Sequence, residues 1–305
     1  MSSRVVLGLC LLGVARSKRG RDVRTNPFVL ISTQRTGSSF VMLTLRRELC
    51  DVDTETELFQ HHEGWNASSQ LDALVALFDG SRAPPPAVAA VPGSGKWRAF
   101  YDESRAYAAP TAFGFKWMMS QDAGRLWDAF LDGTRDVRLV FLKRDNYLKM
   151  LVSKTENGER GTTHALAHPR HAEDVEKLRR ERVELPTTTL VAALDDCAKR
   201  FAQMDDLRRR AEARGSATRV VVYEDLAADR GRFDDLRAFL VEGLDVNRSG
   251  CDAHPRKEAV QIHDRPTSTY VSNWDDVRAT VAAVSYTHLR AHETLRYLVC
   301  RLLLE

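Results

Sequence analysis

The sequence predicts an α/β protein with a mostly parallel sheet and helices on both of its faces. Short continuous apolar runs, typical of strands buried on both faces, alternate with longer amphipathic stretches typical of helices. The first apolar run leads through a short turn rich in hydroxyl side chains directly into such a stretch. A length of 305 residues with 43% hydrophobic residues indicates a globular chain and excludes a disordered tail protein, a collagen-like fibre and a multi-span membrane protein.

The expected strands and helices alternate along the chain. Strands are expected at Phe28–Ser32, Ala112–Met118, Val137–Leu142 and Thr218–Tyr223. A helix with Phe40, Leu43, Leu45 and Leu49 follows the first strand, and later helices are expected at Ala123–Leu131, Asn146–Glu156, Leu190–Ala213 and Phe233–Val241. Parallel strands need such crossover helices to return the chain. The Pro-, Gly- and Ala-rich stretch Ser81–Gly95 and the polar stretch Thr162–Arg170 are expected to be surface loops.

Both ends of the chain differ from its centre. Residues 1–26 form a basic leader whose apolar run, Val5–Ala15, has eleven residues and is shorter than the ~20 residues that span a bilayer. This run is a signal segment, part of a truncated anchor or a frayed leader, and the three interpretations stay open. The localisation is open too, with a secretory or Golgi lumen slightly favoured over the cytoplasm, and membrane association is expected only if the leader belongs to an anchor. Residues 284–305 resemble a translated adapter or vector tail, which leaves residues 27–283 as the functional domain.

The net charge of the chain comes from its ends. The sequence has 45 basic and 42 acidic residues, a formal charge of +3. Residues 1–24 contain six basic residues against one acidic residue, and residues 285–305 contain three against two. The centre therefore has 36 basic and 39 acidic residues, a net charge of −3. Because nucleic-acid binding depends on a basic surface, no nucleic-acid partner is expected.

The turn after the first strand has the composition of an anion-binding loop. A strand-to-helix turn of small residues presents backbone N–H groups and the positive end of a helix dipole to a ligand. Gly37 allows the backbone to approach the ligand closely, and Arg35 adds a permanent positive charge. Further hydroxyl donors come from Thr36, Ser38 and Ser39. A strand, an anion loop and a helix in this order predict a P-loop-type sheet in a single domain, although the turn alone would also suit an ordinary helix cap.

The loop differs from the motif that binds nucleoside triphosphates with Mg²⁺. That motif has a lysine and a hydroxyl residue after its second glycine, whereas no lysine follows Gly37 here. The stretch Gly93–Trp97 has part of the motif but lacks its first glycine and its final hydroxyl, so it is expected to be a solvated loop. No two of the five cysteines have a CxxC spacing. No metal site is expected, and a surface loop is favoured over a zinc site for His164, His168 and His171.

Six motifs resemble those of the PAPS-dependent sulfotransferases, enzymes that use 3′-phosphoadenosine-5′-phosphosulfate (PAPS). The match is to the carbohydrate and bacterial trehalose-type branch. The motifs are Phe28–Phe40, Glu57–Phe59, Phe113–Gln121, Val140–Ser153, Tyr223–Leu226 and Ser272–Val277. They occur in the family's order across roughly residues 27–283, which a chance match to one loop would not produce.

The resemblance implies how the donor is bound. The loop that holds the 5′-phosphosulfate would consist of Gln34, Arg35, Thr36, Gly37, Ser38, Ser39 and Phe40. Arg35 stands where many members have lysine and would neutralise the leaving oxygen. Arg144 and Ser153 would bind the 3′-phosphate, but they are nine residues apart where eight is the commoner spacing, so Lys143 stays open as an alternative to Arg144. No metal is required for such a reaction.

The resemblance also implies a catalytic base and an activity. Glu57 is the first candidate for the base, and His61 and His62 are the alternatives, since imidazole titrates near neutrality. Lys116 would either reach the donor or acceptor or pair with an acid. Tyr223–Leu226 is expected to be a structural turn. The expected reaction is transfer of sulfate from PAPS to a hydroxyl of a carbohydrate or glycoconjugate; the alternatives are a kinase-like nucleotide phosphotransferase and a non-catalytic PAPS- or glycan-binding module.

Overall fold

The computed structural model describes most of the central part of the chain. The described residues are 25–49, 51–59, 65–78, 86–92, 94–106, 111–134, 136–159, 180, 182–245 and 265–288. The leader up to residue 24, the stretch Thr162–Arg170 and residues 289–305 lie outside them. So do five histidines named above: His61, His62, His164, His168 and His171.

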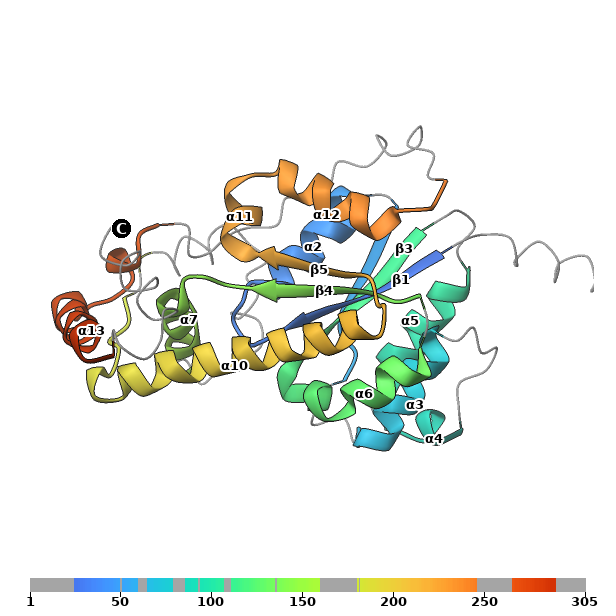
Figure 1. Ribbon diagram of the computed structural model, residues 1–305, viewed down its shortest axis with the longest axis horizontal. Coiled ribbons are helices and arrows are strands. Elements are labelled where there is room, and N and C mark those ends of the chain that lie inside the picture. Colours follow the sequence, from blue (N-terminus) through green and yellow to red (C-terminus); the bar gives the residue numbers. More distant parts are fainter. Residues whose placement is uncertain are drawn as a thin grey trace, which may run out of the picture.

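A five-stranded parallel sheet forms the centre of the molecule (Figure 1). Its spatial order is β2-β3-β1-β4-β5. The strands are β1 (Thr25–Ser32), β2 (Val52–Glu57), β3 (Thr111–Met118), β4 (Arg138–Lys143) and β5 (Thr218–Val222). The four expected strands are thus present, and the predicted α/β class is confirmed.

Helices connect these strands. Those up to β4 are α2 (Ser38–Glu48), α3 (Ala67–Phe78), α4 (Pro86–Ala89), α5 (Gly95–Ala106), the π-helical turn η2 (Met119–Ala123) and α6 (Gly124–Gly133). Those after β4 are α7 (Tyr147–Glu159), α10 (Thr187–Ala213), α11 (Tyr223–Ala228), α12 (Gly231–Val241), the short 3₁₀ helix η4 (Thr267–Thr269) and α13 (Trp274–His288). Within the described part of the chain, no helix is both long and apolar enough to cross a membrane.

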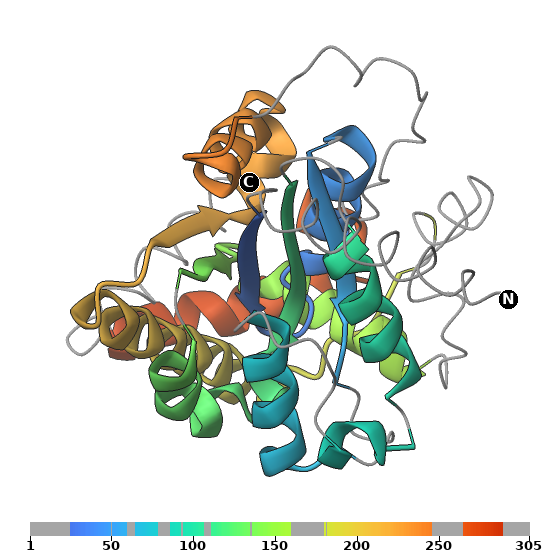
Figure 2. The same cartoon turned by 90° about the vertical axis from the view of Figure 1, so that its right-hand side faces the viewer.

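The helices cover both faces of the sheet, as expected. Side chains alternate along β1, so that Phe28 and Leu30 belong to one core cluster while Val29 and Ile31 belong to the other. The first cluster packs against α2, α11 and α12, and the second packs against helices that include α3, α6 and α10. Figures 1 and 2 show α11 and α12 (orange) on the opposite side of the sheet from α10 (gold).

Three segments differ from their expected structure. Val52–Glu57 forms β2 although it has no apolar run, since it lies at the edge of the sheet, where polar side chains are tolerated. The prediction of a solvated loop at Gly93–Trp97 is wrong. Trp97 lies in α5, is fully buried and stacks on Tyr101 one helical turn later, with ring centroids 5.0 Å apart. Pro86–Ala89, within the expected loop Ser81–Gly95, forms the short helix α4.

The order of the strands determines where a ligand can bind. β1 lies between β3 and β4, so the chain moves to one side of β1 in β2 and β3 and to the other side in β4 and β5. In sheets of this kind, ligands bind beyond the carboxyl ends of the strands, where the direction of winding changes. The loop after β1 begins at this position. α7 and α13 lie beyond the same ends, to which the arrowheads of β4 and β5 point in Figure 1.

Candidate active site

The backbone conformation of the loop between β1 and α2 allows a ligand to approach the loop closely. Arg35 and Gly37 both have left-handed backbone conformations, with φ of 65° and 85°, and such residues cluster at ligand sites. The Thr36 hydroxyl donates to the carbonyl oxygen of Thr33 at 3.0 Å, which closes the loop on itself. Thr36 and Ser38 are buried, whereas Gln34 is exposed. No side chain caps α2 and its first turn has no acidic residue, so the helix end suits an anion.

Position 37 requires glycine for two reasons: its φ is positive, and there is no space for a side chain. A Cβ atom at this position would overlap the ring of Tyr223. Tyr223 begins α11 and also contacts Phe40 edge-on, with ring centroids 5.8 Å apart. The guanidinium of Arg230 lies 5.7 Å from the centre of the Phe40 ring. The anion loop is therefore packed against Tyr223 at the start of α11 and against Arg230, which follows that helix.

Arg144 holds the loop from the end of β4. Its Nη1 donates to the carbonyl oxygen of Arg35 at 2.8 Å, and its guanidinium carbon lies 4.7 Å from the centre of the Tyr223 ring. Its Nε lies 3.5 Å from Glu224 Oε1. The side chain is only 5% exposed, and this burial lowers the pKa of Arg144, while Tyr223 and Glu224 oppose that effect. Arg144 is therefore close enough to act with the loop on one anion.

Glu224 organises the connection between β4 and α7. Its carboxylate accepts hydrogen bonds from the backbone N–H groups of Asp145 and Asn146, at 2.9 and 3.2 Å. Asn146 in turn donates from its side chain to Thr267 Oγ1 at 3.3 Å. These bonds agree with the structural role expected for Tyr223–Leu226, although the turn begins helix α11.

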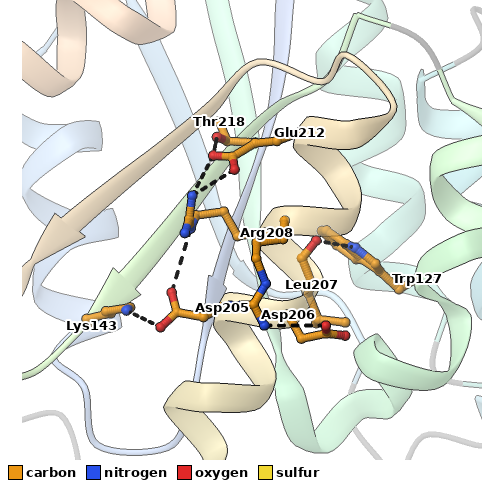
Figure 3. A network of polar contacts seen from close by, with 9 residues as sticks. Trp127, Lys143, Asp205, Asp206, Leu207, Arg208, Glu212 and Thr218 are labelled. Carbon is orange, nitrogen blue, oxygen red and sulfur yellow. Dashed lines mark hydrogen bonds and ion pairs between the residues drawn. The ribbon is translucent and has the colours of Figure 1, made fainter. Parts of the chain in front are cut away.

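Lys143 points away from the loop. Its Nζ lies 2.6 Å from Asp205 Oδ2 of α10, and Arg208 of the same helix lies 3.6 Å from the other carboxylate oxygen. Figure 3 shows this network continuing through Arg208 to Glu212 and Thr218. Of the two alternatives for the 3′-phosphate, Arg144 is the one that contacts the anion loop.

Two residues of α7 lie along the helix that follows Arg144. Ser153 is half-buried, and Glu156, one turn further, is 4% exposed. Burial lowers the pKa of Arg35, and the negative charges of Glu156 and Glu57 oppose this effect. Arg35 is therefore a partly desolvated cation beside two carboxylates. The reduced solvent screening strengthens its attraction for a bound anion, whereas the two carboxylates oppose that attraction.

A bulge places Glu57 opposite Lys116. The pairing of β2 with β3 changes from Glu55 with Phe115 to Glu57 with Lys116, so one residue of β2 is skipped. Such bulges re-aim side chains beside active sites. Glu57 Oε1 lies 2.8 Å from Lys116 Nζ, and the Glu57 side chain is 33% exposed. Its carboxylate is therefore both fixed and accessible.

Lys116 links the candidate base to the anion loop. Besides its ion pair with Glu57, its Nζ lies 3.4 Å from Ser39 Oγ. Burial lowers the pKa of Lys116, and the ion pair and hydrogen bond with Glu57 oppose that shift. Of the two possibilities for Lys116, the structure shows the pairing with an acid. Its contact with Ser39 brings it to the first turn of α2, and reaching the donor or acceptor stays a prediction.

Most of the expected site residues come together at the carboxyl ends of the strands. Arg144 contacts Arg35, and Lys116 joins Glu57 to Ser39. His61 and His62 lie outside the described residues. The described residues contain no group of three or more His, Cys, Asp or Glu side chains that could hold a metal ion.

Three polar residues of the site, Lys96, Gln121 and Glu156, were not predicted from the sequence. Lys96, in the stretch expected to be solvated, donates from Nζ to the carbonyl oxygen of Glu57 at 2.8 Å. Gln121 donates from Nε2 to Glu57 Oε2 at 2.9 Å. Glu156 contributes a negative charge that acts on Arg35. The signal for Gln121 was present, because it ends the matching segment Phe113–Gln121. Nothing in the local sequence of Lys96 indicated its contact with Glu57, which lies 39 residues away.

Comparisons with known proteins give little further information. No family model matches the chain, and no curated protein matches it. Among solved structures, the chain is similar to the crystal structure of a sulfotransferase from Alicyclobacillus acidocaldarius, with 12% sequence identity and a TM-score of 0.41. The comparison covers 90% of this chain and 99% of that chain. At this degree of similarity, the activity of that protein does not transfer to this chain.

Proposed function

We propose that this chain is a sulfotransferase that transfers the sulfuryl group of PAPS to a hydroxyl of a carbohydrate or glycoconjugate. The observation that carries the proposal is the position of Lys116 Nζ, 2.8 Å from Glu57 Oε1 and 3.4 Å from Ser39 Oγ. A candidate base, a buried cation and an anion loop are thereby adjacent. Sulfuryl transfer requires this combination, since most of the catalysis comes from positioning and from charge stabilisation.

The donor would be held at two points. The backbone N–H groups of the loop and the hydroxyls of Ser38 and Ser39 would bind the 5′-phosphosulfate, for which the uncapped start of α2 is suited. Arg144, with the hydroxyl of Ser153 on α7, would bind the 3′-phosphate, a group that ATP lacks. Gln34, Thr36, Gly37 and Phe40 complete the proposed donor site, with Thr36 shaping the loop through its bond to the Thr33 carbonyl.

The reaction itself needs a base and neutralisation of the leaving group. Glu57 would take the proton of the acceptor hydroxyl. The oxygen of that hydroxyl would form a bond to sulfur while the bond from sulfur to the bridging phosphate oxygen breaks. Arg35 would neutralise the charge that develops on this bridging oxygen. Lys116 would stabilise negative charge on the transferring group from the side of Ser39. His61 and His62 remain the alternatives to Glu57 as the base.

Nucleotide selectivity tests the donor assignment. Calorimetric titration of the full chain should give tighter binding of 3′-phosphoadenosine-5′-phosphate than of ATP, with or without Mg²⁺. The 3′-phosphate accounts for this preference, because a charge-assisted bond to a buried arginine contributes about 1.5–3 kcal/mol. A preference for Mg-ATP would instead identify a kinase-like phosphotransferase.

A further inference from the structure

The side chain of Gln121 joins the end of β3 to the carboxylate of Glu57. Gln121 lies in the π-helical turn η2, and it is 2% exposed. Its Nε2 donates to Glu57 Oε2 at 2.9 Å, and its Oε1 accepts from the backbone N–H of Met118 at 3.1 Å. Single π-helical turns occur frequently at functional sites, because the additional residue redirects side chains at that point.

The orientation of the Gln121 amide follows from its partners. The Met118 backbone N–H can only donate, so the amide oxygen of Gln121 must face it. The amide NH₂ group must then face Glu57, whose ionised carboxylate can only accept. Since both ends of the amide have a partner of the correct kind, Gln121 presents a hydrogen-bond donor to Glu57 in a single orientation.

One of the bonds that hold the turn does not depend on this side chain. Trp117 Nε1 donates to the carbonyl oxygen of Gln121 at 3.1 Å, and this bond does not involve the amide group. Changing the side chain to one without an amide therefore removes its bonds to Glu57 and to the Met118 N–H and leaves the bond from Trp117 in place. The two bonds of the amide give Gln121 a role beyond filling space in the core.

We propose that Gln121 is a positioning residue that fixes the carboxylate of Glu57 toward the acceptor hydroxyl; this inference rests on the proposed function. Lys116 binds one oxygen of Glu57 and Gln121 binds the other, so the plane of the carboxylate is defined by two donors from β3 and the turn that follows it. With Lys116 alone, the carboxylate would be free to rotate about a single contact. A base must lie within hydrogen-bond reach of the proton that it takes.

The variant Gln121→Met tests this role, because methionine is of similar length and cannot donate a hydrogen bond. We expect kcat to fall at least about tenfold from misplacement of the base, while the Kd of 3′-phosphoadenosine-5′-phosphate stays within about twofold of the wild-type value. The pH profile of turnover should change as well, since the lost bond goes to the carboxylate that takes the proton.

Gln70→Met is the matched control. Gln70 is equally buried, at 2% exposure, but lies on α3. Gln70→Met changes a buried amide in the same way but far from Glu57, so it should leave kcat and the pH profile as they are in the wild type. If Gln121→Met does not fold, Gln121→Asn replaces it, because the shorter amide can bind the Met118 N–H but cannot also reach Glu57. Equal effects of the Gln121 and Gln70 variants on kcat and on the pH profile would overturn the proposal.

Crystal structures of the donor-free variant and wild type separate this inference from the proposed function. We expect the Glu57 carboxylate to change its rotamer in the variant. An unmoved carboxylate would overturn the positioning role whatever the turnover. Failure of the wild-type chain to transfer sulfuryl would overturn the proposed function, while the position of Glu57 in the two structures would still show whether Gln121 fixes it.

Discussion

Two arginines from different strands meet at the anion loop. Arg35 follows β1 and Arg144 follows β4, and the guanidinium of Arg144 binds the carbonyl oxygen of Arg35 at 2.8 Å. Burial lowers the pKa of both side chains, yet an arginine keeps its proton in such surroundings. The site therefore has a permanent positive charge that water screens only weakly, which suits a doubly anchored anion.

At the residue scale, Arg144→Ala should weaken the binding of 3′-phosphoadenosine-5′-phosphate by about 30-fold or more, because a buried charge-assisted bond is worth about 2 kcal/mol or more. Lys143→Ala is the matched control. It removes the neighbouring cation, which pairs with Asp205, and should leave the affinity unchanged. Calorimetry on both variants provides the measurement. A larger loss from the lysine variant would reverse the assignment of the 3′-phosphate site.

The ion pair of Lys116 gives a prediction about pH. Burial lowers the pKa of Lys116 and Glu57 opposes the shift, so Glu57→Gln should lower this pKa further. The folded variant would then release its proton at a lower pH than the unfolded chain, whose lysine has the ordinary value of 10.5. Between these two values, the free energy of unfolding should rise with pH.

A ¹⁵N-NMR titration of the Lys116 ammonium group in the wild type and in Glu57→Gln measures this change. Lys199→Ala, on the distant helix α10, removes a different lysine and should leave the Lys116 titration as it is in the wild type. An increase in the Lys116 pKa on loss of Glu57 would show that the carboxylate does not stabilise the ammonium group.

At the scale of elements, the junctions between strands and helices form the site. The loop after β1, the bulge in β2, the π-helical turn after β3 and the connection after β4 each contribute one part. These junctions depart from regular structure in different ways. Each departure brings a polar group to the carboxyl ends of the strands. Their conformations should therefore be sensitive to single backbone changes.

Gly37→Ala should impair the loop for two reasons. Alanine is disfavoured at a φ of 85° by about 1 kcal/mol or more, and its Cβ would overlap Tyr223. Gly215→Ala is the matched control, because Gly215 has a φ of 80° with no atom within 4 Å of the position of the added Cβ. We expect both variants to lose stability in urea unfolding, and only Gly37→Ala to lose donor affinity, by at least about tenfold. Equal affinities would show that the loop does not bind the donor.

The sequence allowed the regular elements of this site to be predicted, but not their irregular junctions. The apolar run Phe28–Ser32 predicts β1 because a strand buried on both faces needs such a run. β2 was not predicted, since an edge strand does not need an apolar run. The bulge that turns Glu57 toward Lys116 was not predicted either, because it depends on pairing between strands far apart in the sequence. Lys96 was misjudged for a similar reason, because burial of the adjacent Trp97 comes from tertiary packing.

At the scale of the whole molecule, a buried ion pair joins two segments that lie 186 residues apart in the sequence. Arg237 of α12 binds both carboxylate oxygens of Asp51, which precedes β2, and both side chains are at most 10% exposed. Asp51→Ala should destabilise the chain by about 3–5 kcal/mol, because it leaves a buried charge without its partner. Urea unfolding gives this free energy.

The surface pair of Arg210 and Asp128, which joins α10 to α6, is the control for the buried pair. Asp128 is about half exposed, so Asp128→Ala should cost less than about 1 kcal/mol. Similar losses in the two variants would show that the buried pair has no special role in holding α12 against the sheet.

The central claim is tested most directly by transfer of a ³⁵S-labelled sulfuryl group from PAPS to a panel of glycans and glycolipids. We expect the wild-type chain to label a hydroxyl of at least one carbohydrate acceptor. Glu57→Gln should bind 3′-phosphoadenosine-5′-phosphate as tightly as the wild type and transfer the label at least about 100-fold more slowly. Normal donor binding by the wild type with no labelled acceptor in the panel would contradict the account and indicate a binding module instead.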